Sequence, residues 1–142
     1  MLNQTSILSL LISTLFFSST SVQADIVIRK SGASVLRISS KGTIRAKGKK
    51  VGSVDSSGRV RKNGSTVGEV DSRGSIRKSG SKIGTIKANG SIYKSGKLWG
   101  KIDSSGSIRK SGSSWGSASS SSSESDRQKV AAAIVFFGGF FD

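Results

Sequence analysis

Basic side chains recur in one short motif along the sequence, and they could bind phosphate groups. The motif is Arg-Lys-Ser-Gly or a close variant of it, and it recurs with a spacing of 16 residues. A cluster of Lys and Arg attracts phosphate-bearing partners, and each contributes about 1 kcal/mol near an anionic membrane surface. The candidate anion-binding residues are Arg29, Lys30, Arg45, Arg61, Lys62, Arg77, Lys78, Lys94, Arg109 and Lys110.

The sequence lacks the side chains on which most enzymes depend. It contains no His and no Cys, which removes the thiol nucleophile and the usual proton-transfer group at neutral pH. One Asp per repeat, as at Asp55, Asp71 and Asp103, is too sparse for a calcium-binding coil and is typical of a turn. Trp99 and Trp115 stand where other repeats have Val or Ile, which favours packing over stacking on a sugar, base or lipid. We expect no catalytic residue, no metal and no cofactor, and a protein that is not an enzyme.

The basic motif belongs to a longer repeat of 16 residues that organises most of the chain. Glycine recurs at this step in three columns, the first at 42, 58, 74, 90 and 106. Apolar residues follow the same step, and one column consists of Ile44, Val60, Ile76, Ile92 and Ile108. A partial unit, residues 28–32, precedes five full ones.

Each unit contains two short strands separated by turns. β-Branched residues alternate with clusters of Asp, Asn, Ser and Gly, as in residues 51–54 and 55–58, and this pattern indicates strands joined by tight turns. Strands of about four residues cannot bury enough surface alone, so the units must share a core. We expect a mainly β protein in which about 10 to 12 short antiparallel strands close into a ring or barrel. The alternative is a β-solenoid with one repeat per coil.

The C-terminal segment predicts what such a ring encloses. Residues 126–137 would form a helix that is apolar on every side, and such a helix must be buried. Its length of about 18 Å is too short for a bilayer core of about 30 Å but similar to the height of a ring of short strands. Ser125 and Gln128 form a capping-box pattern at its start, and Gly138 ends it. We expect this helix to fill the core; the alternatives are a helix docked outside the sheet or associated with a membrane.

The other segments complete the predicted organisation of the chain. The first 24 residues have no charged side chain and contain an apolar stretch followed by Val22-Gln23-Ala24, which predicts a signal peptide cleaved after Ala24. An uncleaved N-terminal anchor is the alternative. The predicted segments are 1–24 signal peptide, 25–116 repeat domain, 117–125 serine-rich linker, 126–137 helix and 138–142 tail. We expect an exported protein of the periplasm, the cell envelope or the extracellular space.

Several motifs of the repeat and of the C-terminal segment match a known family pattern. They are Gly-Ser-Ile-Arg-Lys-Ser-Gly at 74–80 and 106–112, the pairs Ile83-Gly84 and Trp99-Gly100, and the Ala/Phe-rich run 131–137. Over residues 26–137 the sequence resembles the five-fold β-flower family of small secreted bacterial proteins. The resemblance implies shallow hairpin petals around a hydrophobic centre, similar in shape to the barrel and central helix of the tubby-like proteins, which bind phosphoinositides. The resemblance brings no catalytic residues and no established activity to this chain.

The charge pattern is the main sequence evidence on function. The chain has 23 Lys and Arg against 8 Asp and Glu, a formal net charge of +15. Consecutive turns of a hairpin ring alternate between its two ends, so the Arg-Lys-Ser-Gly turns would gather on one rim and the Asp turns on the other. We expect a non-enzymatic binding module whose cationic rim recognises anionic surfaces or ligands, such as lipid headgroups, lipopolysaccharide or other polyanions. The alternatives are a structural or self-assembling envelope protein without a specific ligand, and a rim whose charge serves only solubility.

Overall fold

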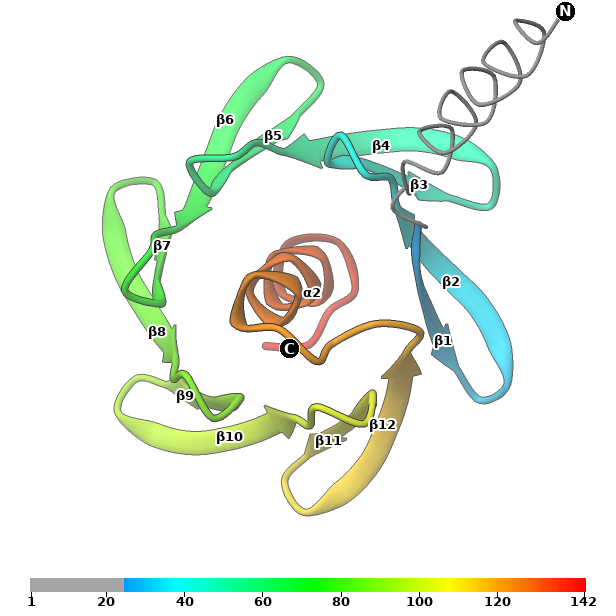
Figure 1. Ribbon diagram of the computed structural model, residues 1–142. Helices are drawn as coiled ribbons and strands as arrows, with labels where there is room; N and C mark the ends of the chain where they lie inside the picture. The colour runs from blue at the N-terminus through cyan, green and yellow to red at the C-terminus, as the bar shows by residue number, and fades with distance from the viewer. Residues whose placement is uncertain (1–24) are drawn as a thin grey trace, which may run out of the picture.

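Twelve antiparallel strands form a closed barrel around a C-terminal helix, α2 (Glu124–Phe137), as Figure 1 shows. This computed structural model describes residues 25–142, and the predicted signal peptide, residues 1–24, lies outside the described part. The strands are β1 (Ile26–Lys30), β2 (Ala33–Ile38), β3 (Thr43–Ala46), β4 (Lys49–Val54), β5 (Arg59–Lys62), β6 (Ser65–Val70), β7 (Ser75–Lys78), β8 (Ser81–Ile86), β9 (Ser91–Lys94), β10 (Lys97–Ile102), β11 (Ser107–Lys110) and β12 (Ser113–Ala118). The expected barrel with a central helix is confirmed, and the solenoid alternative is wrong.

The first and last strands pair with each other and close the barrel. Ile28 lies opposite Ala118 and Arg29 opposite Ser117 in this antiparallel ladder. Each of the twelve strands therefore has a partner on both sides. The partial unit at 28–32 is part of a complete hairpin, β1–β2, so the barrel holds six hairpins where the sequence indicated five full repeats.

Two kinds of turn alternate between the two ends of the barrel. Within a hairpin, two residues with positive φ join the strands, for example Asn63 at 53° and Gly64 at 81°, which is the type I′ turn that suits the twist of a hairpin. Between hairpins, a four-residue turn ends in Gly, as at Gly58 with a φ of 92°. A Cβ atom on Gly58 would overlap with the carbonyl oxygen of Val70. Space as well as conformation therefore requires glycine in the four-residue turn.

Each hairpin contains one β-bulge. In β5–β6, Val60 lies opposite Gly68 but Arg61 lies opposite Thr66, so Val67 is the extra residue. The same shift occurs in all six hairpins. A bulge bends its strand and increases the local twist, and the hairpin tips point outward around the ring in Figure 1.

We call the six hairpins petals 1 to 6, from β1–β2 to β11–β12. The end of the barrel that carries the two-residue turns is the petal end, and the end with the four-residue turns is the turn end. The apolar column that includes Ile44, Ile76 and Ile108 is fully buried, and so is the segment Val130 to Ile134 of α2. The small side chains of Ala131, Ala132 and Ala133 let the helix fit inside a ring of this size.

The helix begins two residues earlier than the sequence predicted. Ser123, and not Ser125, is the N-cap, because its hydroxyl accepts a hydrogen bond from the backbone amide of Asp126 at 3.0 Å. Arg127 then ties the helix to the turn end: its guanidinium donates to the carbonyl oxygens of Ser121, Ser122 and Ala88. Since β12 continues to Ala118, the serine-rich connection is shorter at both ends than expected.

The predicted tail, residues 138–142, is part of the core. Phe140 is fully buried and Phe141 is 7% exposed. Four phenylalanine rings occupy the space over one glycine column, with Phe137 at Gly52, Phe136 at Gly68, Phe141 at Gly84 and Phe140 at Gly100. Petal 1 has Leu36 in this column, and its buried side chain fills the space itself. The C-terminal phenylalanines therefore form a plug that closes the petal end from inside.

Candidate anion-binding surface at the petal end

The petal end carries most of the positive charge of the chain. The six petal tips contain fifteen of the 23 basic residues and no Asp or Glu; they are residues 29–34, 45–50, 61–66, 77–82, 93–98 and 109–114. The other eight basic residues lie toward the turn end with seven of the eight acidic residues, and the eighth is the C-terminal Asp142. The basic turns and the Asp turns thus lie at opposite ends of the barrel.

The arginines and lysines of the motif lie on opposite faces of the petals. The residue before each arginine, such as Ile28 or Val60, is fully buried, and side chains alternate along a strand. The arginine therefore points outward and the following lysine points inward. The expected crown of ten residues is in fact two rings. The outer arginine ring consists of Arg29, Arg45, Arg61, Arg77 and Arg109, and the inner lysine ring consists of Lys30, Lys62, Lys78, Lys94 and Lys110.

Part of the lysine ring contacts the C-terminal plug. The ammonium group of Lys94 donates to the carbonyl oxygen of Phe141, and that of Lys110 donates to the carbonyl oxygen of Asp142 at 2.9 Å. Lys94 also lies 4.4 Å from the centre of the Trp99 ring, within the range of a cation–π interaction. Lys94 and Lys110, two of the ten predicted anion-binding residues, therefore donate hydrogen bonds to the C-terminal segment.

The two tryptophans pack against the same plug. Trp99 donates its indole N–H to the carbonyl oxygen of Phe140 at 2.6 Å. Its ring meets Phe141 edge to face with centroids 6.1 Å apart, and Trp115 meets Phe140 in the same way at 5.4 Å. Lys30 lies 4.7 Å from the centre of the Trp115 ring. Both tryptophans therefore have the packing role that the sequence favoured.

Shallow grooves run between neighbouring petals on the outside of the barrel. Between petals 2 and 3 a groove of about 350 Å³ is lined by Lys50, Gly52 and Arg61. Between petals 5 and 6 a groove of about 370 Å³ is lined by Leu98, Trp99 and Arg109, among others. A guanidinium group can bind a phosphate through two parallel N–H groups. The arginine ring therefore offers repeated, open contacts for anions around the barrel.

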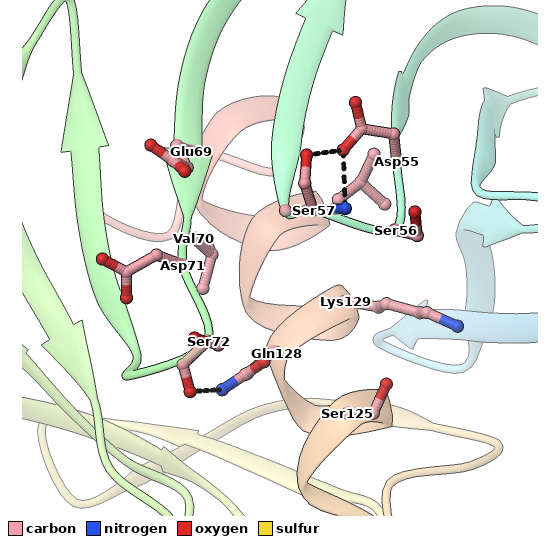
Figure 2. Close-up of a pocket in the computed structure, with 12 residues that line it drawn as sticks. Asp55, Ser56, Ser57, Glu69, Val70, Asp71, Ser72, Ser125, Gln128 and Lys129 are labelled. Carbon is pink, nitrogen blue, oxygen red and sulfur yellow. Dashed lines mark hydrogen bonds between the residues drawn. The ribbon is translucent and has the colours of Figure 1, made fainter.

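A larger pocket of about 520 Å³ lies at the turn end, between two four-residue turns and the start of α2 (Figure 2). Its lining includes Asp55, Glu69, Asp71 and Lys129. One carboxylate oxygen of Asp55 accepts hydrogen bonds from the hydroxyl and the amide of Ser57 and from the amide of Arg59. The Ser57 hydroxyl is the main cause that lowers the pKa of Asp55, and the backbone amides and Arg61 add to it.

The aspartates of this pocket therefore close their own turns. Asp71 accepts from the amides of Arg73 and Ser75 in the same way as Asp55 does in the preceding turn. This is the role that the sequence predicted for them. Within residues 25–142 no group of His, Cys, Asp and Glu side chains is placed to hold a metal ion.

Sequence reasoning missed two features of the petal end. The first is the use of Lys94 and Lys110 by the C-terminus. The second is petal 5, where Tyr93 replaces the arginine and Leu98 replaces a polar residue of the repeat. The signal for the second was present, because both residues depart from otherwise basic or polar columns.

No family model, curated protein or solved structure that we compared with the chain matches it. None of the helices in residues 25–142 has the length and apolar character needed to cross a membrane.

Proposed function

We propose that the protein is an exported, non-enzymatic binding module whose petal end binds anionic surfaces. The observation that carries this proposal is the charge separation, with fifteen basic and no acidic residues in the petal tips. The side chains of the arginine ring point outward, away from the C-terminal segment that Lys94 and Lys110 contact inside the barrel. Charges on a common surface act together on a polyanion or a membrane, where each adds about 1 kcal/mol before salt screens it.

Two features favour binding over the structural alternative. Assembly through the sheet needs a free edge strand, and the pairing of β1 with β12 occupies both edges of the repeat array. A charge that served only solubility would need no particular distribution, yet the turn end has nearly equal numbers of basic and acidic residues. The ligand classes that fit are lipid headgroups, lipopolysaccharide and other polyanions, because all of them display phosphate or carboxylate groups.

A pair of triple charge reversals tests the proposal. The first variant changes Arg29, Arg45 and Arg109 to Glu, which are exposed residues on the three adjacent petals 1, 2 and 6. The second changes Lys41, Arg59 and Arg73 to Glu, which are exposed residues of the turn end. Both variants reduce the formal net charge from +15 to +9, so the overall charge cannot account for a difference in binding between them.

We expect the petal variant to bind inorganic polyphosphate and phosphatidylglycerol vesicles about 100-fold more weakly than the original protein at low salt. The turn variant should lose much less, and the original protein should lose affinity steeply as salt rises. Circular dichroism establishes that both variants are folded. Equal losses in the two variants, or no binding by the original protein, would overturn the proposal.

A further inference from the structure

Petal 5 differs from the other five petals on its outer face. In each petal the bulge leaves one pair of residues side by side next to the tip, and in petals 1 to 4 and 6 this pair is an arginine with Ser, Thr or Lys. In petal 5 the pair is Tyr93 and Leu98. Leu98 is 64% exposed and is the one exposed large hydrophobic residue in the described chain.

The exposed leucine lies among basic and aromatic side chains. It lines the groove between petals 5 and 6 together with Trp99, Lys101 and Arg109. Lys97 precedes it at the tip and is exposed. The tips of petals 5 and 6 contain no Asp or Glu. Petal 5 thus combines the exposed Leu98 and the aromatic residues Tyr93 and Trp99 with surrounding positive charge.

We propose that petal 5 is the part of the protein that inserts into the interface of an anionic lipid bilayer, with Leu98 entering the apolar layer. This inference rests on the proposed function and assigns its ligand to a membrane. Aromatic side chains such as Tyr93 prefer the boundary between headgroups and acyl chains. Lys97 and Arg109 can reach back to lipid phosphates while their stems lie along the apolar layer.

The composition of the petal favours a bilayer over the other partners of a cationic surface. A soluble polyanion has no apolar phase in which Leu98 could be buried. A stable protein interface buries about 800 Å² on each partner with an apolar centre, and a single exposed leucine between charged residues is too small for that. A bilayer takes up single apolar side chains and presents phosphate groups directly above them.

Two variants first remove the leucine from petal 5 and then move it to petal 3, and the second of them keeps the composition of the chain. Thr66 occupies in petal 3 the position that Leu98 has in petal 5, and it is also exposed. Leu98→Thr should weaken binding to phosphatidylglycerol vesicles about tenfold or more, since burial of one leucine is lost, and should leave polyphosphate binding unchanged. The double variant Leu98→Thr with Thr66→Leu should stay weak. Full recovery of vesicle binding in the double variant would overturn the assignment to petal 5.

Labelling gives a second, independent readout because the chain contains no Cys. We expect a polarity-sensitive fluorophore at Leu98→Cys to shift to the blue when phosphatidylglycerol vesicles are added, and the same fluorophore at Thr66→Cys to stay unchanged. Vesicle binding without a shift at position 98 overturns this inference but leaves the proposed function intact. No binding of the original protein to either vesicles or polyphosphate overturns the proposed function itself. Self-association that Leu98→Thr abolishes would assign petal 5 to a second copy of the chain and also overturn the inference.

Discussion

The two glycines that flank β7 show how the ends of the barrel differ. Both have positive φ, 89° at Gly74 in the four-residue turn and 83° at Gly80 in the petal tip. A Cβ atom on Gly74 would overlap with the carbonyl oxygen of Ile86, whereas one on Gly80 would have no atom within 4 Å. The turn end is packed by its own backbone, and the petal tips are open.

The polar side chains show the same difference. At the turn end, Ser121 donates to the carbonyl oxygen of Asp103 at 2.6 Å, Arg127 caps three carbonyl groups, and Asp55 closes its turn. At the petal end, one ion pair in residues 25–142 involves the outer arginine ring, and it joins Arg61 to Asp55 at 4.0 Å. The fold therefore uses polar groups at both ends, but at the petal end their partners lie inside the barrel, as for Lys94, Trp99 and Lys110, and the outer arginine ring is largely unused.

The largest effect on stability is expected inside the petal end, where the C-terminal plug fills the core. Phe140→Ala removes a fully buried ring over Gly100 and should lower the free energy of unfolding by about 3 to 5 kcal/mol. Leu98→Ala, on the outer face of the same end, should change it by less than about 0.5 kcal/mol. Urea denaturation followed by circular dichroism measures both. Similar values for the two variants would contradict the division of the petal end into a structural inside and a free outside.

The glycine pair of β7 tests the comparison between the ends directly. Gly80→Ala should cost about 1 kcal/mol, because only the left-handed conformation is strained. Gly74→Ala carries the same strain and also forces the backbone of Ile86 to move, so it should cost about 3 kcal/mol or more. The melting temperatures of the two variants give the difference. If Gly74→Ala melts no lower than Gly80→Ala, then the turn end is not the tightly packed end.

The smallest effect concerns the pH dependence of the turn end. The lowered pKa of Asp55 means that its ionised form is favoured by the folded protein. The stability that it contributes is present above the ordinary pKa of an aspartate and is lost as the pH falls through the lower, folded value. Because the side chain is 41% exposed, this contribution should be well below about 1 kcal/mol.

Asp55→Asn should therefore be slightly less stable than the original protein at pH 6, and the difference should shrink as the pH approaches 2. Thermal denaturation over this pH range provides the measurement. A stability difference that grows on acidification would show that folding does not lower the pKa of Asp55.

Several features of the candidate site could have been predicted more closely from the sequence. Arg61 and Lys62 are neighbours in a strand, and the alternation of side chains alone places them on opposite faces.

The first repeat is harder to recognise from the sequence, because Leu36 stands where the other petals have glycine. The helix start could not be read from the sequence, because Ser119 to Ser123 and Ser125 all offer capping hydroxyls. The contacts of Ser121 and Arg127 with distant turns select Ser123.

The 16-residue period specifies the units of this protein, since turn type, strand direction and the alternation of side chains depend on residues within one unit. A ring of such units and a buried apolar helix follow from the need to bury apolar surface. Contacts between residues far apart in the chain depend on the closed barrel. These contacts place the Phe137 ring over Gly52 and let Lys94 and Lys110 donate hydrogen bonds to C-terminal carbonyl groups. They also leave Leu98 exposed. No local preference contains this information, because the partners meet only when β1 and β12 pair around α2.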